Sequence, residues 1–156
     1  MDALLDMNVL REGAVSLAHE AGLKILEIYA TEFEVTSKAD TSPVTTADLA
    51  SQAHIVAGLK KLLPTVPVIA EEGHLPPYDE RKEWSLFWLV DPLDGTKEFV
   101  KRNGEFSVNI ALVENGFPIL GVVHAPVTGL TYVGTTKSRH AQASAWRYDQ
   151  EGGAHP

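Results

Sequence analysis

Cysteine is absent from the 156 residues of this chain. Disulfide bonds and thiolate metal ligands are therefore excluded, and the composition suits a reducing compartment. Long apolar runs are also absent, because no stretch approaches the roughly 20 residues needed to cross a bilayer. The start, Met1 to Asp6, lacks the basic and apolar regions of a signal peptide. We predict a soluble, cytoplasmic protein without a transmembrane segment, with peripheral attachment to the inner membrane as the alternative.

Basic residues are scarce, with 13 Lys and Arg against 21 Asp and Glu, a net charge of −8. Proteins that bind nucleic acid polymers normally present a basic face to the phosphate backbone, so that class is disfavoured. An acidic protein can still bind phosphates when metal ions reverse the local charge. The length and the hydrophobic content of 44% suit one globular domain.

Two amphipathic helices are predicted in the first half of the chain. Apolar residues recur at helical spacing from about Leu4 to Phe33, and a second such stretch runs to Pro64. Thr45 and Thr46 suit the N-cap of the second helix, which would place Asp48 in its first turn.

Short apolar or β-branched runs follow and predict strands. The turn sequences between the later runs, Asn115-Gly116 and 126–129, suit antiparallel hairpins. The predicted class is α+β, with two N-terminal helices packed on a largely antiparallel sheet. We assign residues 1–148 to one domain and 149–156 to a polar tail or hairpin turn without a return strand. The predicted strands are Val66–Ala70, Leu86–Val90, Ser107–Val113, Ile119–Ala125 and Leu130–Val133.

The most informative segment follows the strand that ends at Val90. Two carboxylates, Asp91 and Asp94, stand three residues apart, with Pro92 stiffening the turn and Gly95 allowing close backbone approach to a ligand. Hard cations such as Mg²⁺ prefer oxygen ligands, which these carboxylates and the carbonyl of Leu93 can supply. The residues after Gly95 could open a short helix whose free N–H groups face a phosphate. The alternative is that both acids are ordinary turn residues.

A third acidic position follows another predicted strand. Glu71 and Glu72 come directly after Ala70, so they could complete a carboxylate cluster that holds two cations, an arrangement suited to phosphate hydrolysis. A solvated acidic loop is the alternative. Asp48 is explained by a helix start, or it could accept a hydrogen bond from a hydroxyl such as that of Thr96.

These motifs together resemble the inositol monophosphatase superfamily of Mg²⁺-dependent phosphatases. The resemblance rests on Ser42-Pro43-Val44-Thr45 with Asp48, on Glu71-Glu72, and on Asp91-Pro92-Leu93-Asp94-Gly95-Thr96. It continues through 121–126 and 132–134 to Ala145-Trp146. Thr96-Lys97-Glu98-Phe99 is more similar to the bacterial CysQ type, the 3'(2'),5'-bisphosphate nucleotidases of sulfur assimilation, than to inositol monophosphatases.

The resemblance implies a role for each matching residue. Glu71, Asp91, Asp94 and the carbonyl of Leu93 match the ligands of two or three Mg²⁺ ions. The phosphate-binding turn is matched by Gly95 and Thr96, and the group that positions the attacking water by Thr96, Glu71 and Asp48. Lys38 and Asp40 match a mobile loop that contributes to substrate binding and to a further metal position, and Glu72 matches an auxiliary ligand.

The implied activity is a phosphomonoesterase that hydrolyses a small phosphorylated metabolite, 3'-phosphoadenosine 5'-phosphate, to AMP and phosphate through a metal-activated water. An inositol-phosphate or sugar-phosphate phosphatase is the alternative. The implied fold is the N-terminal domain of the inositol monophosphatase/fructose-1,6-bisphosphatase-like α/β sandwich, with the second domain missing. No Trp-Asp-x-x-Ala motif of that second domain follows Ala145-Trp146. A further alternative is therefore a catalytically incomplete fragment that binds Mg²⁺ or phosphate, or a subunit that pairs as a homodimer through an open sheet edge.

Overall fold

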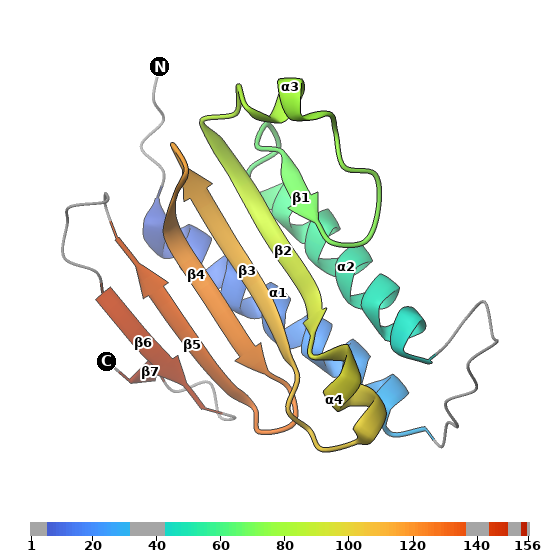
Figure 1. Cartoon of the computed structure of the whole chain (residues 1–156). Coiled ribbons are helices and arrows are strands. Elements are labelled where there is room, and N and C mark those ends of the chain that lie inside the picture. The colour runs from blue at the N-terminus through green and yellow to red at the C-terminus, as the bar shows by residue number, and fades with distance from the viewer. Residues whose placement is uncertain (1–5, 32–42, 137–143, 150–153, 156) are drawn as a thin grey trace.

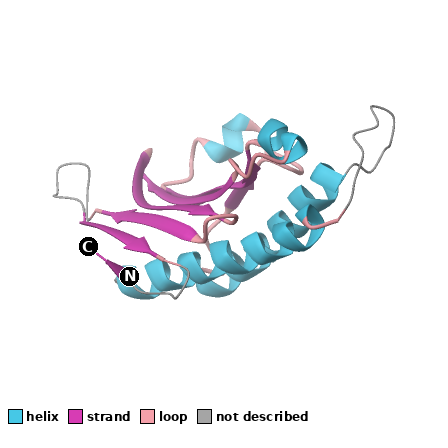
Figure 2. Cartoon of the chain, turned by 90° about the horizontal axis from the view of Figure 1, so that it is seen from below, coloured by secondary structure: helices cyan, strands magenta, loops and turns pink. Residues whose placement is uncertain are grey.

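The computed structural model of the chain describes residues 6–31, 43–136, 144–149 and 154–155. One seven-stranded sheet forms the centre, and the two long helices lie side by side across one of its faces (Figures 1 and 2). This arrangement confirms the predicted α+β class. No helix in the described ranges combines the length and the apolar character needed to cross a bilayer.

The two long helices form where the apolar periodicity predicts them. Helix α1 spans Met7–Tyr29, and Asp6 caps it by accepting hydrogen bonds from the backbone N–H groups of its first turn. Helix α2 spans Pro43–Leu62. It starts at Pro43, whose missing N–H costs nothing at a first helical position. The predicted start at Thr45 and Thr46 is therefore too late, and Asp48 lies in the second turn instead of the first.

The strands follow one another across the sheet in chain order (Figure 1). The first two strands, β1 and β2, pair in parallel, and every later neighbouring pair is antiparallel. The β3–β4 hairpin turns at Asn115 and Gly116, both with positive φ, as a tight hairpin turn requires. The strands are β1 Val68–Ala70, β2 Leu86–Asp94, β3 Ser107–Glu114, β4 Phe117–Ala125, β5 Leu130–Thr135, β6 Ser144–Tyr148 and β7 Ala154–His155.

Some elements differ from the sequence prediction. Strand β2 continues to Asp94, four residues beyond the predicted end at Val90. Two short helices connect the strands, α3 at Tyr78–Arg81, which was not predicted, and α4 at Thr96–Lys101, which was. Strand β6 was also not predicted. The expectation of a final turn without a return strand is wrong, because β7 pairs with β6 through Arg147↔His155 and Tyr148↔Ala154.

The hydrophobic core lies between the two long helices and the sheet. Residues that alternate along the strands point toward the helices, among them Trp88, Ile110 and Leu112, each with at most 1% of its surface exposed. Burying a side chain of this size stabilises the fold by about 1.5–3 kcal/mol. On the opposite face, Leu89 and Tyr132 expose 46% and 53% of their surface. The helices therefore cover one face of the sheet, and the buried apolar side chains of the strands lie on that face.

One polar cluster is buried between α1 and the sheet. Thr131 Oγ1 lies 2.6 Å from His19 Nε2 and 2.8 Å from His124 Nδ1, and the two imidazole rings are 4.5 Å apart between centroids. Burial lowers the pKa of His19, and burial together with the neighbouring His19 lowers the pKa of His124 to about 4. Near neutral pH both histidines are therefore uncharged, and they join α1 to the sheet through Thr131.

Candidate active site

Parallel pairing of β1 and β2 brings the first two predicted acids together. Ala70 is in register with Val90, and the backbone N–H of Glu71 donates to Val90 O over 3.3 Å. The next residue on each strand is an acid, so Glu71 and Asp91 lie side by side where β1 ends and β2 continues. Burial raises the pKa of Asp91, and the neighbouring side chain of Glu71 raises it further. The two carboxyl groups therefore lie close enough to affect each other electrostatically.

A β-bulge shapes the segment that carries the second pair of acids. Asp91 pairs with Asn109 whereas Asp94 pairs with Ser107, so three steps along β2 match two along β3. A bulge tolerates Pro92, which has no N–H for the ladder. The buried hydroxyl of Ser51, on α2, donates to Pro92 O over 2.7 Å. The sequence predicted a turn here, and the structure has a bulge that is anchored to α2.

The loop after β1 is held by a side-chain amide from α2. Gln52 Oε1 accepts from the backbone N–H of Glu72 over 2.9 Å, and Gln52 Nε2 donates to the carbonyl of Glu72. One amide thus satisfies both backbone groups of the residue next to Glu71, which would otherwise have to find partners in the loop. Gln52 therefore fixes the backbone from which Glu71 extends.

Asp48 is the most buried acid near the strand ends, with 6% of its surface exposed. It lies on the same face of α2 as Ser51 and Gln52, because positions three and four apart are neighbours on a helix. Its Oδ1 atom has no hydrogen-bond partner. Burial and the charges of Glu72, Glu71 and Asp91 raise the pKa of Asp48 to about 7. Near neutral pH this group is poised to give up or take a proton.

Asp91 also titrates well above the usual range of an aspartate. Burial raises its pKa to about 6, with further contributions from the neighbouring side chain of Glu71 and the charge of Asp94. Crowded carboxylates that cannot all be ionised are stabilised either by protons or by a cation. At neutral pH, where protons are scarce, this donor set fits a hard divalent cation such as Mg²⁺.

The acids do not form a complete metal-binding group as they stand. Among the residues that the structure describes, no three His, Cys, Asp or Glu side chains are placed so that they could hold a metal ion. Asp94 Oδ2 instead accepts a hydrogen bond from Asn109 Nδ2 over 3.2 Å. The structure thus brings Glu71 and Asp91 together with Asp94 as an electrostatic neighbour, and does not assemble the three-carboxylate cluster that the sequence predicted.

Gly95 forms the turn between the bulge and α4. Its φ of 91° lies in the left-handed region, and a Cβ atom there would approach Glu105 O to 2.9 Å. Only glycine fits such a position without strain. Thr96 follows as the first residue of α4 and is exposed. The predicted hydrogen bond from the Thr96 hydroxyl to Asp48 Oδ1 is not formed in this structure, because Oδ1 has no partner.

Lys38 and Asp40 lie outside the described residues, as does Ser42. Their predicted contribution to a loop near the site stays a prediction. The sequence interpretation missed Ser51, Gln52 and Asn109, which support the site. For Ser51 and Gln52 the sequence does contain a clue: they follow Asp48 by three and four positions, which places them on the same face of the helix.

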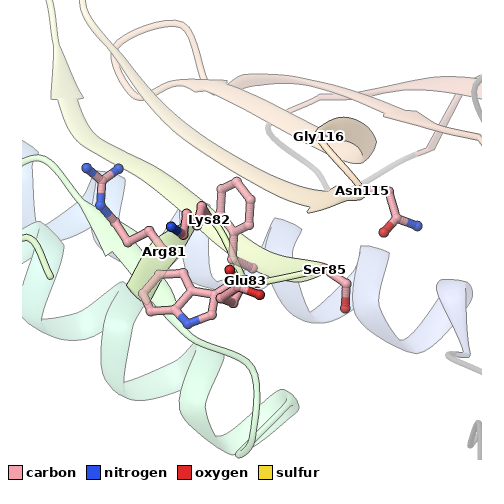
Figure 3. A pocket seen from close by; sticks show the side chains of 8 residues that line it. Arg81, Lys82, Glu83, Ser85, Asn115 and Gly116 are labelled. Atoms are coloured by element: carbon pink, nitrogen blue, oxygen red, sulfur yellow. The ribbon is translucent and has the colours of Figure 1, made fainter. Parts of the chain in front are cut away.

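One pocket among the described residues lies away from these acids. It has a volume of about 550 Å³ and is open to solvent near the start of β2 (Figure 3). Phe87, one of its lining residues, precedes Asp91 by four positions, about 13 Å at the rise of a strand. None of the predicted site residues lines it. The lining residues are Arg81, Lys82, Glu83, Trp84, Ser85, Phe87, Asn115 and Gly116.

Comparison with known proteins gives a consistent result. Residues 6–147 match the inositol monophosphatase family. The chain is 51% identical to the 3'(2'),5'-bisphosphate nucleotidase CysQ of Escherichia coli strain K12 over 133 residues, which are 84% of this chain and 51% of that protein. The chain thus spans about half the length of this curated relative.

Solved structures show the same partial coverage. The crystal structure of CysQ from Bacteroides thetaiotaomicron, a bacterial member of the inositol monophosphatase family, superposes with a TM-score of 0.81 at 41% identity, over 93% of this chain and 51% of that one. The IMPase of Thermotoga maritima gives a TM-score of 0.69 at 29% identity, over 89% and 51% of the two chains.

Proposed function

Because the chain belongs to the inositol monophosphatase family, we propose that it carries the carboxylate half of a Mg²⁺-dependent phosphatase site and serves as part of a 3'(2'),5'-bisphosphate nucleotidase. The proposed reaction is hydrolysis of 3'-phosphoadenosine 5'-phosphate to AMP and phosphate. The nucleotidase names of the curated relatives support this substrate class.

The observation that carries the proposal is the crowding of acids at one edge of the sheet. Burial raises the pKa values of Asp48 and Asp91, and the nearby charge of Glu71 adds to both shifts. An exposed acidic loop without a function would not need to desolvate its carboxylates. Crowded and partly buried acids are typical of functional sites that bind a cation or transfer a proton.

The proposed ligands of Mg²⁺ are the carboxylates of Glu71, Asp91 and Asp94 and the carbonyl of Leu93, with Glu72 as an auxiliary group. When bound, two or three Mg²⁺ ions would supply the positive charge that makes water nucleophilic at neutral pH and offsets the charge of the phosphate. The chain's own residues would orient the reactants.

In the proposed reaction, Glu71 and the hydroxyl of Thr96 orient a water molecule toward phosphorus. Asp48 would accept the hydrogen bond of that hydroxyl, which its unpartnered Oδ1 supports. The backbone N–H groups of Gly95 and Thr96 would bind the phosphoryl oxygens. The water oxygen would form a bond to phosphorus as the ester P–O bond breaks, and the proton that the water loses would be transferred to the leaving nucleoside oxygen.

Two further candidates remain as proposals. Inositol phosphates would suit the same groups, and the similarity to the Thermotoga maritima IMPase supports this reading. A fragment that binds Mg²⁺ or phosphate without turnover is favoured by one observation, the lack of a complete three-ligand group among the described residues. Homodimer formation through the sheet edge stays a prediction.

Phosphate release tests the proposal. The purified chain is incubated with 3'-phosphoadenosine 5'-phosphate and Mg²⁺, and released phosphate is measured colorimetrically. We expect Mg²⁺-dependent release that exceeds release from inositol 1-phosphate and that falls by at least about 100-fold in Asp91→Asn, because removal of even a supporting group of a metal site typically costs 10–100-fold.

Asp79→Asn is the matched control for that assay. Asp79 lies on α3, is exposed, and forms an ion pair with Lys82, the residue that follows this helix. The control variant should keep the wild-type rate. Equal rates of phosphate release in the wild-type and Asp91→Asn proteins would overturn the proposal. Faster release from inositol 1-phosphate than from 3'-phosphoadenosine 5'-phosphate would favour the inositol-phosphate alternative.

A further inference from the structure

Asn109 is attached to the carboxylate centre without being one of its acids. It lies on β3 directly opposite Asp91, on the strand face that points away from the helices. Its Nδ2 donates to Asp94 Oδ2 over 3.2 Å, and Ser107 Oγ donates to its Oδ1 over 3.1 Å. Hydroxyl, amide and carboxylate therefore form one chain of hydrogen bonds that runs from β3 to the end of β2.

The chemistry of the partners fixes the orientation of this amide. An ionised carboxylate only accepts hydrogen bonds, so the NH₂ group of Asn109 must face Asp94 and its carbonyl must face the Ser107 hydroxyl. The arrangement engages Oδ2 of Asp94. Oδ1, on the other side of the carboxylate, is then the oxygen that can face a cation.

A neutral donor has an advantage at this position. Asp94 is exposed and follows a bulge, where the regular backbone pairing of β2 with β3 is interrupted. Its side chain therefore needs another restraint. Lysine or arginine could also hold it, but a fixed positive charge would compete with a metal ion for the carboxylate. The amide restrains the rotation of Asp94 and leaves its full negative charge available.

We infer that Asn109 is a positioning residue for the proposed metal centre: it orients Asp94 for cation binding through the Nδ2–Oδ2 hydrogen bond, with Ser107 holding the amide. This inference rests on the proposed function. It predicts that loss of the amide weakens cation binding while the fold keeps its stability, since the hydrogen bond joins two side chains outside the core.

Mn²⁺ serves as the probe, because it prefers the same oxygen ligands as Mg²⁺ and its free ion is counted directly by electron paramagnetic resonance. We expect Asn109→Ala to raise the dissociation constant for Mn²⁺ about 10-fold, the usual size of an effect from a group that orients a metal ligand. The metal-free melting temperature should be unchanged. Ser107→Ala should give a smaller shift in the same direction.

A double-mutant cycle distinguishes action through Asp94 from a general disturbance. In an Asp94→Ala background, Asn109→Ala should cause no further loss of Mn²⁺ affinity. Asn103→Ala is the matched control, because this amide accepts from the backbone N–H of Glu105 and does not touch a carboxylate. It should bind Mn²⁺ like the wild type.

The outcomes separate the inference from the function on which it rests. Wild-type affinity in Asn109→Ala would overturn the positioning role and leave the metal centre standing, as would an equal loss in the presence and absence of Asp94. A wild-type chain that takes up no Mn²⁺, with Mg²⁺ also without effect on its melting temperature, would overturn the metal centre and the inference together.

Discussion

In the Asp91→Asn variant, Mg²⁺ should no longer raise the melting temperature, whereas it should stabilise the wild-type chain at about pH 8. A ligand that binds only the folded state stabilises it by about 2.7 kcal/mol at one hundred times its dissociation constant. The variant lacks one of the proposed ligands, so this gain should disappear. Without metal the variant should be at least as stable as the wild type, because it has one charge fewer beside Glu71 and Asp94.

The pH dependence of the Mg²⁺ effect follows from the raised pKa of Asp91. Its folded-state pKa of about 6 lies above the ordinary aspartate value, so protonation favours the folded state as the pH falls through about 6. Protons and Mg²⁺ then compete for the same oxygens, and the stabilisation by Mg²⁺ should shrink below about pH 6. Thermal denaturation with and without Mg²⁺ checks both statements. A full Mg²⁺ effect in Asp91→Asn would contradict the assignment, and Asp79→Asn should behave like the wild type.

The buried histidine pair should contribute less to stability as the pH falls. The folded-state pKa of His124, about 4, lies below the ordinary value of 6.5, so the unfolded chain binds the proton more readily. The contribution of the neutral ring is fully present above about pH 6.5 and is lost progressively as the pH falls toward 4. The shift corresponds to at most about 3 kcal/mol, and the lowered pKa of His19 acts in the same direction.

The His124→Asn variant isolates this contribution. Asparagine keeps a polar group near Thr131 and removes the titrating ring. Its packing cost does not depend on pH, whereas Asp48 and Asp91 titrate alike in both proteins and cancel in the difference. Urea unfolding across the range from about pH 7.5 to 5 should show that the stability of the wild type, measured relative to that of the variant, decreases as the pH falls. Equal losses would show that His124 does not carry the acid sensitivity.

The sequence was sufficient to predict the core of the fold and the position of the acids. Helical spacing located α1 and α2, and the apolar runs located the first five strands, because burial of one face imposes a period that can be recognised in a single sequence. The string from Asp91 to Thr96 predicted α4, whereas the bulge at Asp91–Asp94 was expected to be a turn. The proximity of Glu71 and Asp91 required one further fact, the parallel pairing of β1 with β2, which no local pattern contains.

The supporting residues could not be predicted for a physical reason. Gln52 and Asn109 act through single hydrogen bonds to partners that are distant in sequence, and a polar residue on a helix or strand has the same appearance whether it faces solvent or a carboxylate. The start of α2 at Pro43 was missed because threonine is a common N-cap and proline is equally acceptable one position later. Strands β6 and β7 are too short for the alternation of apolar and polar residues to be recognised in the sequence.

Carbon-13 NMR of the side-chain carboxyl groups tests the central claim most directly. Mg²⁺ is titrated into the chain at about pH 7.5, which is above the raised pKa values of Asp48 and Asp91, so that both carboxyl groups are mostly ionised and can respond to a cation. The account predicts that the carboxyl resonances of Glu71, Asp91 and Asp94 shift together and saturate, while that of Asp79 stays constant. Resonances of these three acids that do not respond to Mg²⁺, or that respond no more than that of Asp79, would contradict it.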